Sequence, residues 1–225
     1  MPFSPSHVEL RDDNPLLYNG KSVLKAVSNI NNIISPDLKG FEVDDQKNID
    51  NKLLSFIAGE FEKKGYHILG ASELIPNLTV EPGFLCGSSY ESLNRDIFKA
   101  DSVLRALSPE DIGQGIVVEN GLVLGIETIQ GTNELLKFVE HTALNLRVKG
   151  QGGIFVKRPK CDQDLRFDLP VIGSETITLA CQAGLRGLVV SPSSVIILER
   201  SQCIEIAEAN DFFILARDSV SWKYS

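Results

Sequence analysis

The chain has 225 residues, of which 43% are hydrophobic and 23% charged, and its formal net charge is −8. This composition is typical of globular domains and argues against disorder, a collagen-like fibre or a coiled coil. The length predicts one or two domains. Because an acidic surface repels phosphate backbones, we expect no general nucleic-acid binding. The longest apolar runs, at 122–126 and 195–198, have the length of strands and are much shorter than the roughly 20 residues of a membrane-spanning helix.

The first part of the chain predicts two helices. Prolines interrupt the first forty residues, where the pattern supports only a short helix over 21–27. The clearest helix covers 50–64, because Leu53, Ile57 and Phe61 recur at every fourth position and so form one apolar stripe. This helix is the first element on which a fold can be based.

The signals that follow this helix favour an α/β unit. Gly65 stands where a left-handed residue ends a helix, and Asp45 suits its beginning. A short strand is expected over 66–69, and helix, glycine and strand together form half of an α/β unit. The stretch 77–87 holds glycine and proline without an amphipathic period, and we expect it to be a linker between domains.

A helix and a hairpin are expected next. Apolar residues share one face of a helix over 94–107. Two apolar runs, 115–119 and 122–127, flank Asn120 and Gly121. Asn-Gly between such runs is the strongest short-range signal for a β-hairpin, because both residues tolerate the positive φ of a type I′ turn.

The rest of the chain alternates between the two kinds of element. We expect Thr132 and Ser174 to cap the helices that they begin. Helices are predicted at 132–139, 174–182 and 200–210, and strands at 153–157, 187–190, 195–198 and 212–215. The order of elements predicts an α/β fold with short loops.

The loop after the strand 153–157 carries the chemistry. Asp164, Arg166 and Asp168 alternate with apolar residues, so on an extended chain their side chains would share one face. One interpretation is an edge strand with surface ion pairs, which contribute about 0–1 kcal/mol each. The other is a site where carboxylates hold a divalent cation while Lys157 and Lys160, with Arg166, neutralise phosphate oxygens.

These residues resemble a known signature. The UDP-2,3-diacylglucosamine pyrophosphatases of the LpxI type, from lipid A biosynthesis, carry the pattern GGxxVKxxKxxQDxRxDxPxIGxxT. The positions of this chain that match it are Gly152, Gly153, Val156, Lys157, Lys160, Gln163, Asp164, Arg166, Asp168, Pro170, Ile172, Gly173 and Thr176. Upstream, the segments around Asp111–Gln114 and Glu127–Thr132 are similar to two further segments of that family.

The resemblance implies an activity. Members of this family hydrolyse the pyrophosphate of UDP-2,3-diacylglucosamine to UMP and 2,3-diacylglucosamine 1-phosphate (lipid X), with a Mg²⁺ or Mn²⁺ ion. It also implies that the protein acts in the cytoplasm and makes transient contact with the surface of the inner membrane. A relative that lost turnover and only binds a lipid or a nucleotide sugar is the alternative.

The resemblance also implies roles for single residues. Asp168 and Asp164 are the expected catalytic carboxylates, and these two with Glu127 are the expected metal ligands. Glu127 is equally well interpreted as a residue that merely completes the hairpin strand. The remaining expected substrate contacts are Lys157, Lys160, Arg166, Gln163, Gln114, Thr132 and Thr176.

The N-terminal part departs from the family. Members begin with a glycine-rich strand and turn, and Gly20 is the only glycine of this chain before Gly40. We therefore expect a truncated Rossmann-like portion over 1–80, followed by an LpxI-type α/β catalytic domain over 86–218. A parallel sheet without its first strand would expose an edge, which a homodimer could cover.

Overall fold

The computed structural model describes residues 10–12, 14–88, 93–142, 146–147, 152–161 and 163–219. The contacts between residues divide the chain into two compact units, Met1–Ile68 and Leu69–Ser225.

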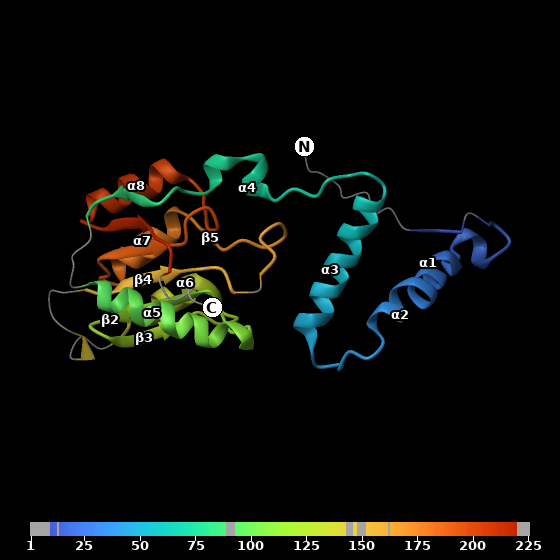
Figure 1. Ribbon diagram of the computed structural model, residues 1–225, viewed down its shortest axis with the longest axis horizontal. Coiled ribbons are helices and arrows are strands. Elements are labelled where there is room, and N and C mark those ends of the chain that lie inside the picture. Colours follow the sequence, from blue (N-terminus) through green and yellow to red (C-terminus); the bar gives the residue numbers. More distant parts are fainter. Residues whose placement is uncertain are drawn as a thin grey trace. The chain divides into compact units, whose positions relative to one another are not determined.

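The described part of the first unit is helical (Figure 1). Its elements are η1 (Tyr18–Gly20), α1 (Leu24–Asn29), the π-helical turn η2 (Ile30–Ile34), α2 (Ser35–Leu38) and α3 (Gln46–Lys63). Residues 24–38 are helical throughout, so the short helix predicted over 21–27 starts later and runs further. Because no strand occurs among the described residues of this unit, the expected Rossmann-like portion is not confirmed.

Helix α3 confirms the clearest prediction from the sequence. It begins after Asp45, whose carboxylate accepts a hydrogen bond from the backbone N–H of Asn48 at 3.4 Å. It ends at Lys63, and Gly65 follows with a φ of +84°. The strand predicted over 66–69 is wrong, because this stretch pairs with no other strand and its Tyr66 side chain is exposed.

The second unit is built on a six-stranded sheet with the order β1-β8-β6-β4-β2-β3. Strands β4, β6 and β8 are parallel, whereas β1 runs antiparallel to β8, and β2 runs antiparallel to both β4 and β3. The strands are β1 (Gly83–Cys86), β2 (Gly115–Glu119), β3 (Leu122–Ile126), β4 (Ile154–Lys157), β6 (Gly187–Val190) and β8 (Phe213–Ala216). Two short strands, β5 (Val171–Ile172) and β7 (Ile196–Ile197), form a separate parallel pair.

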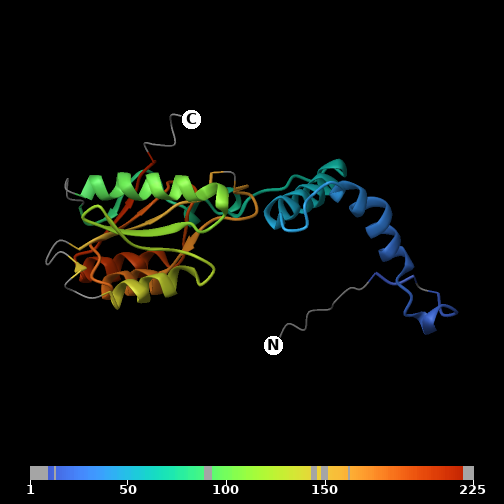
Figure 2. The ribbon, with the colours of Figure 1, turned by 90° about the horizontal axis from the view of Figure 1, so that it is seen from below.

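Helices cover both faces of this sheet (Figure 2). Helix α5 packs on one face, and α6, α7 and α8 pack on the other. Their bounds are α5 (Asn94–Leu107), α6 (Gly131–Glu140), α7 (Ser174–Gln182) and α8 (Arg200–Ala209); the short helices are α4 (Ala71–Leu74), η3 (Pro76–Leu78) and η5 (Ser108–Glu110). The expected α/β architecture is therefore confirmed for this unit.

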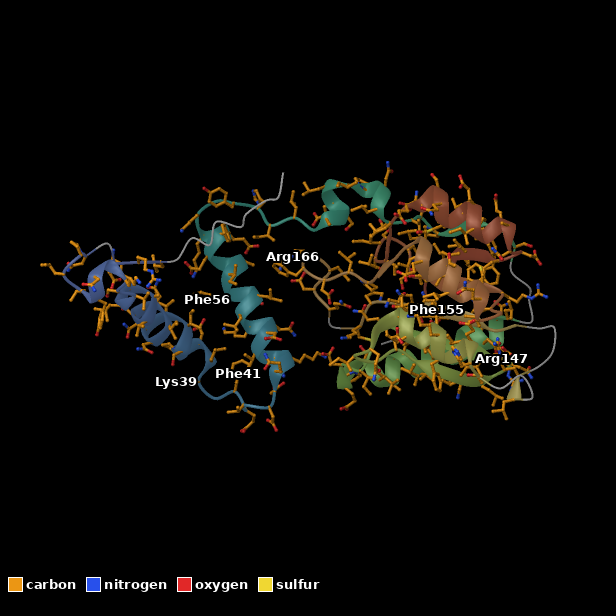
Figure 3. All side chains as sticks on the ribbon, turned by 180° about the vertical axis from the view of Figure 1, so that it is seen from behind. Lys39, Phe41, Phe56, Arg147, Phe155 and Arg166 are labelled. Atoms are coloured by element: carbon orange, nitrogen blue, oxygen red, sulfur yellow. The ribbon has the colours of Figure 1, made fainter. Side chains whose placement is uncertain are left out.

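The alternation of side chains along β4 determines what its last residues face. Ile154 and Val156 lie in the core under α5, whereas Phe155, labelled in Figure 3, is fully buried in the core under α6, α7 and α8. Successive side chains of a strand point to opposite faces. Lys157 therefore continues on the face of Phe155, and Arg158 on the face of α5.

The predicted hairpin is confirmed in β2 and β3. Asn120 and Gly121 have φ values of +51° and +77°, as a type I′ turn requires. The pairing shifts by one residue between Val117 and Val118, a bulge that the sequence pattern does not indicate.

Three other expectations are corrected. The stretch 77–87 is not a linker throughout, because it contains β1, which pairs with β8. Thr132 and Ser174 are not helix caps, since Gln130 and Gly173 occupy the capping positions. Their hydroxyl groups instead donate hydrogen bonds to Glu127 and Glu199.

No helix in the described ranges is both long enough and apolar enough to cross a bilayer.

Candidate active site

The strand order brings the polar residues to one edge of the sheet. Lys157 ends β4, and the antiparallel strand β2 begins opposite it at Gly115. Because β3 returns antiparallel to β2, Glu127 also reaches this edge, where its N–H donates to the carbonyl of Gly115 at 2.7 Å. The parallel strands β4, β6 and β8 all end here. In open α/β sheets, ligands bind beyond the carboxyl ends of the strands.

A buried network joins Lys157, Glu127 and Thr132. The Lys157 ammonium donates to both carboxylate oxygens of Glu127, at 2.7 and 2.6 Å, and to the Thr132 hydroxyl at 2.8 Å. That hydroxyl donates to Glu127 at 2.7 Å. Burial lowers the pKa of Lys157, and the charge of Glu127 opposes this shift. The network therefore holds a cation in a poorly solvated position.

Two glycines make room for Glu127. A β-carbon at Gly113 would lie 2.0 Å from the Glu127 carbonyl oxygen, and one at Gly115 would lie 2.8 Å from its carboxylate. Real β-carbons do not approach so closely, so only glycine fits at either position. This packing explains in physical terms why the residues around Gln114 are glycines.

A second network ends on Asp168. The Gln114 side-chain amide donates to the side-chain oxygen Oε1 of Gln163 at 2.9 Å, and this oxygen also accepts from the backbone N–H of Lys160 at 2.9 Å. The amide of Gln163 then donates to the Asp168 carboxylate. These bonds orient Gln163, and Gln163 in turn orients Asp168. The Lys160 ammonium lies beside this network and donates to Asp111.

The expectation of one shared face for Asp164, Arg166 and Asp168 is wrong. The chain turns here, because the N–H groups of Phe167 and Asp168 donate to the Asp164 carbonyl at 3.1 and 3.2 Å. Side chains at alternate positions share a face only on an extended backbone. Arg166, labelled in Figure 3 on the loop after β4, pairs instead with Asp164 at 2.8 Å. This pairing lowers the pKa of Asp164.

The expected metal ligands do not form one cluster in this structure. Glu127 is bound by Lys157 and Asp164 by Arg166, and the described residues contain no group of three His, Cys, Asp or Glu side chains suited to a metal. Mg²⁺ in proteins is often held by one or two carboxylates together with substrate phosphates. Asp168, an exposed carboxylate that interacts electrostatically with Lys157, fits that smaller role.

Thr176 lies apart from both networks. It is buried in the first turn of α7, where its hydroxyl accepts a hydrogen bond from the N–H of Gly173 at 3.4 Å. Asp162, which adds a negative charge to this loop in the sequence, lies outside the described residues.

Arg158 is the residue that sequence reasoning missed. It is fully buried and donates to Asp101 at 2.5 Å, to the Ser191 hydroxyl at 3.1 Å and to the carbonyl of Arg217 at 2.6 Å. These bonds tie the ends of β4, β6 and β8 to α5. The available signal was Asp101, which with Asp96 places a carboxylate on the mainly apolar buried face of the predicted helix.

The fold and the site together describe an α/β protein with lysines and a positioned carboxylate at the carboxyl edge of its sheet, an arrangement suited to phosphate chemistry. Residues 81–215 match the family model of the LpxI C-terminal domain, and the chain belongs to this family. This confirms the family expected from the sequence.

Two further comparisons describe the chain. It is 38% identical over 172 residues to the UDP-2,3-diacylglucosamine pyrophosphatase LpxI of Caulobacter vibrioides, an alignment that covers 75% of this chain and 61% of the relative. Residues 4–72 match a different model, the N-terminal domain of enolase. That match spans the helical first unit, where a truncated Rossmann-like portion was expected.

Proposed function

We propose that this chain hydrolyses the pyrophosphate bond of UDP-2,3-diacylglucosamine to UMP and lipid X. The observation that carries the proposal is the network Gln114–Gln163–Asp168, which presents an oriented carboxylate beside Lys157 and Lys160. The segment that holds it lies within the match to the LpxI C-terminal domain. The chain spans 61% of the length of the Caulobacter relative, which acts on this substrate according to its name.

The side chains of the site have different roles in hydrolysis. Lys157 and Lys160 neutralise charge on non-bridging phosphate oxygens when the substrate replaces Thr132 and Asp111 as their partners, and Arg166 supplies further positive charge when it turns from Asp164. Asp168 orients or deprotonates the attacking water. The backbone carbonyl of Asp164 stabilises the turn of the loop by accepting hydrogen bonds. Its side chain is the second catalytic carboxylate after that of Asp168.

A Mg²⁺ or Mn²⁺ ion belongs to this proposal, with Asp168 as its protein ligand. Such an ion would supply Lewis acidity to the phosphoryl centre. Glu127 is not needed for it, because Lys157 already engages both of its carboxylate oxygens.

A hollow in the second unit is a candidate binding site for the acyl chains of the substrate. A mainly apolar hollow of about 330 Å³ lies between β3 and α6, lined by Gly125, Ile126, Leu135 and Phe138 among others. Phe138 is 64% exposed, and Ile129, which stands between the lining residues Thr128 and Gln130, is 99% exposed. These apolar side chains suit transient contact with the cytoplasmic surface of the inner membrane. Separately, β3 is an edge strand and suits pairing with a second copy of the chain.

The direct test is to incubate the chain with UDP-2,3-diacylglucosamine and Mg²⁺ or Mn²⁺ and to measure UMP. We expect UMP to appear in proportion to protein and to disappear when a chelator removes the ion. Stoichiometric retention of the acylated sugar without UMP would show instead a binding protein that lost turnover. Residues 4–72 match a different family model, and binding without turnover is therefore the main alternative to hydrolysis.

A change at Gln163 tests how Asp168 is held. In Gln163→Glu, a carboxylate replaces the amide that donates to Asp168. A carboxylate cannot donate to Asp168 and repels its negative charge, so we expect the rate of UMP release to fall by about 10-fold. Gln202→Glu, an exposed change on α8, is the matched control. An unchanged rate of UMP release would show that Gln163 does not orient Asp168.

A further inference from the structure

The turn over residues 164–168, which ends on Asp168, has little core packing of its own. The side chains of Leu165 and Phe167 are 37% and 36% exposed, so the turn buries only part of its apolar surface. Its ion pair also lies at the surface, where such pairs contribute about 0–1 kcal/mol. The backbone of the turn therefore has to be held in place by a contact from elsewhere in the chain.

Gly70 makes a contact of this kind. It is buried, and a β-carbon added to it would lie 3.2 Å from the Cα atom of Arg166 and 3.4 Å from the carbonyl oxygen of Leu165. Few β-carbons approach a neighbour so closely, and backbone atoms cannot swing aside as the end of a flexible side chain can. The backbone of Gly70 thus packs directly on the middle of the turn.

The close approach, and not the backbone conformation, explains the glycine at this position. Gly70 has a φ of −71° and a ψ of 156°, an extended conformation that any residue adopts. A glycine that does not need a positive φ is typical of a place where two backbones meet. A side chain at residue 70 would push the turn, and with it Asp168, out of position.

The segment that carries Gly70 is anchored independently of the turn. We call residues 70–80 the strap; it contains α4 and η3. At its near end, the Gly70 N–H donates to the Glu73 carboxylate at 2.8 Å. At its far end, Val80 is 4% exposed and its carbonyl accepts from the N–H of Ser193 at 2.9 Å. A helical segment fixed in this way can brace a loop that packs against it.

We propose that Gly70 is a positioning residue: the strap braces the turn 164–168 through the backbone of Gly70 and so holds Asp168 where the Gln163 amide meets it. This inference rests on the proposed function for the role of Asp168. It adds to the site a segment that precedes the whole six-stranded sheet in the chain. Glu73 maintains the shape of the near end of the strap.

The first test is limited digestion with trypsin, which needs no substrate. Cleavage after Arg166 requires the turn to open, and its rate follows the population of the open form. In Gly70→Val we expect this cleavage to be about 10-fold faster, because the new side chain meets the backbone of the turn. Gly59→Val is the matched control, since a β-carbon added there within α3 enters open space. Its cleavage after Arg166 should equal that of the unaltered chain.

Two variants of Glu73 test the strap without introducing a clash. Glu73→Ala removes the carboxylate that accepts from the Gly70 N–H, whereas Glu73→Gln keeps an acceptor oxygen. We expect faster cleavage after Arg166 in Glu73→Ala and a nearly normal rate in Glu73→Gln. Because Glu73 is exposed, both variants should fold, so this pair decides the question if Gly70→Val does not.

Kinetics then test the positioning role. For Gly70→Val we expect kcat for UMP release to fall by about 10- to 100-fold with little change in KM, because a displaced catalytic group affects chemistry more than binding. Cleavage after Arg166 that is unchanged in Gly70→Val and Glu73→Ala would overturn the inference, as would faster cleavage with an undiminished kcat. If the unaltered chain releases no UMP, the proposed function fails, and the digestion still decides whether the strap braces the turn.

Discussion

Asp168→Asn is expected to lower the rate of UMP release by about 10²–10⁴-fold, the range for loss of a general acid–base group. Asparagine keeps the shape of the side chain and can still meet Gln163, but it cannot take a proton or hold a cation as a charged ligand. Because Asp168 is exposed, the free energy of unfolding should hardly change. Initial rates at saturating substrate, with circular dichroism on the same samples, measure both effects.

The matched control for this variant is Glu208→Gln, which removes one exposed carboxylate on α8 far along the chain from the loop. It corrects for the change in net charge. We expect its rate to equal that of the unaltered chain. If Asp168→Asn kept more than a tenth of the rate, Asp168 would be neither the base nor the metal ligand.

Lys157→Met should produce the largest loss of stability. It leaves Glu127, which is 8% exposed, buried without its cation. Removing one partner of a buried ion pair costs about 3–5 kcal/mol of the free energy of unfolding. Urea denaturation followed by fluorescence or circular dichroism measures this loss, and we expect turnover to be abolished as well.

A double variant separates structure from chemistry at this position. Lys157→Met with Glu127→Leu replaces the pair by apolar side chains, a change that is often neutral for stability. We expect the free energy of unfolding to recover most of the loss while UMP release stays absent, because the positive charge of Lys157 is missing beside the phosphate. Recovery of turnover in the double variant would assign Lys157 a purely structural role.

The sequence predicts the structure best where a pattern depends on neighbouring residues. The helix predicted over 94–107 is α5 with the same bounds, and the Asn-Gly hairpin is present with the expected φ values. Both depend on neighbouring residues alone, through the helical period and the turn residues. The signature also identified the loop that holds Gln163 and Asp168.

Errors occur where the partner of a residue is distant in the chain. Thr132 has the chemistry of a helix cap, yet its hydroxyl bonds to Glu127 and Lys157, since β2 brings β3 and β4 together. Residues 83–86 look like part of a linker because their pattern is short, but β8 supplies the hydrogen bonds that make them a strand. The turn at Asp164 was likewise not predicted, because the expectation of one shared face assumed an extended backbone.

Periodicity, turn residues and the polar signature thus establish the α/β class, most of the elements and the candidate residues of this chain. Folding adds the pairs: Lys157 with Glu127, which are 30 positions apart, and Arg158 with Asp101, which are 57 apart. The reason is physical, because the order of strands in a sheet depends on packing between distant segments, and no local pattern records which charges will meet at its edge.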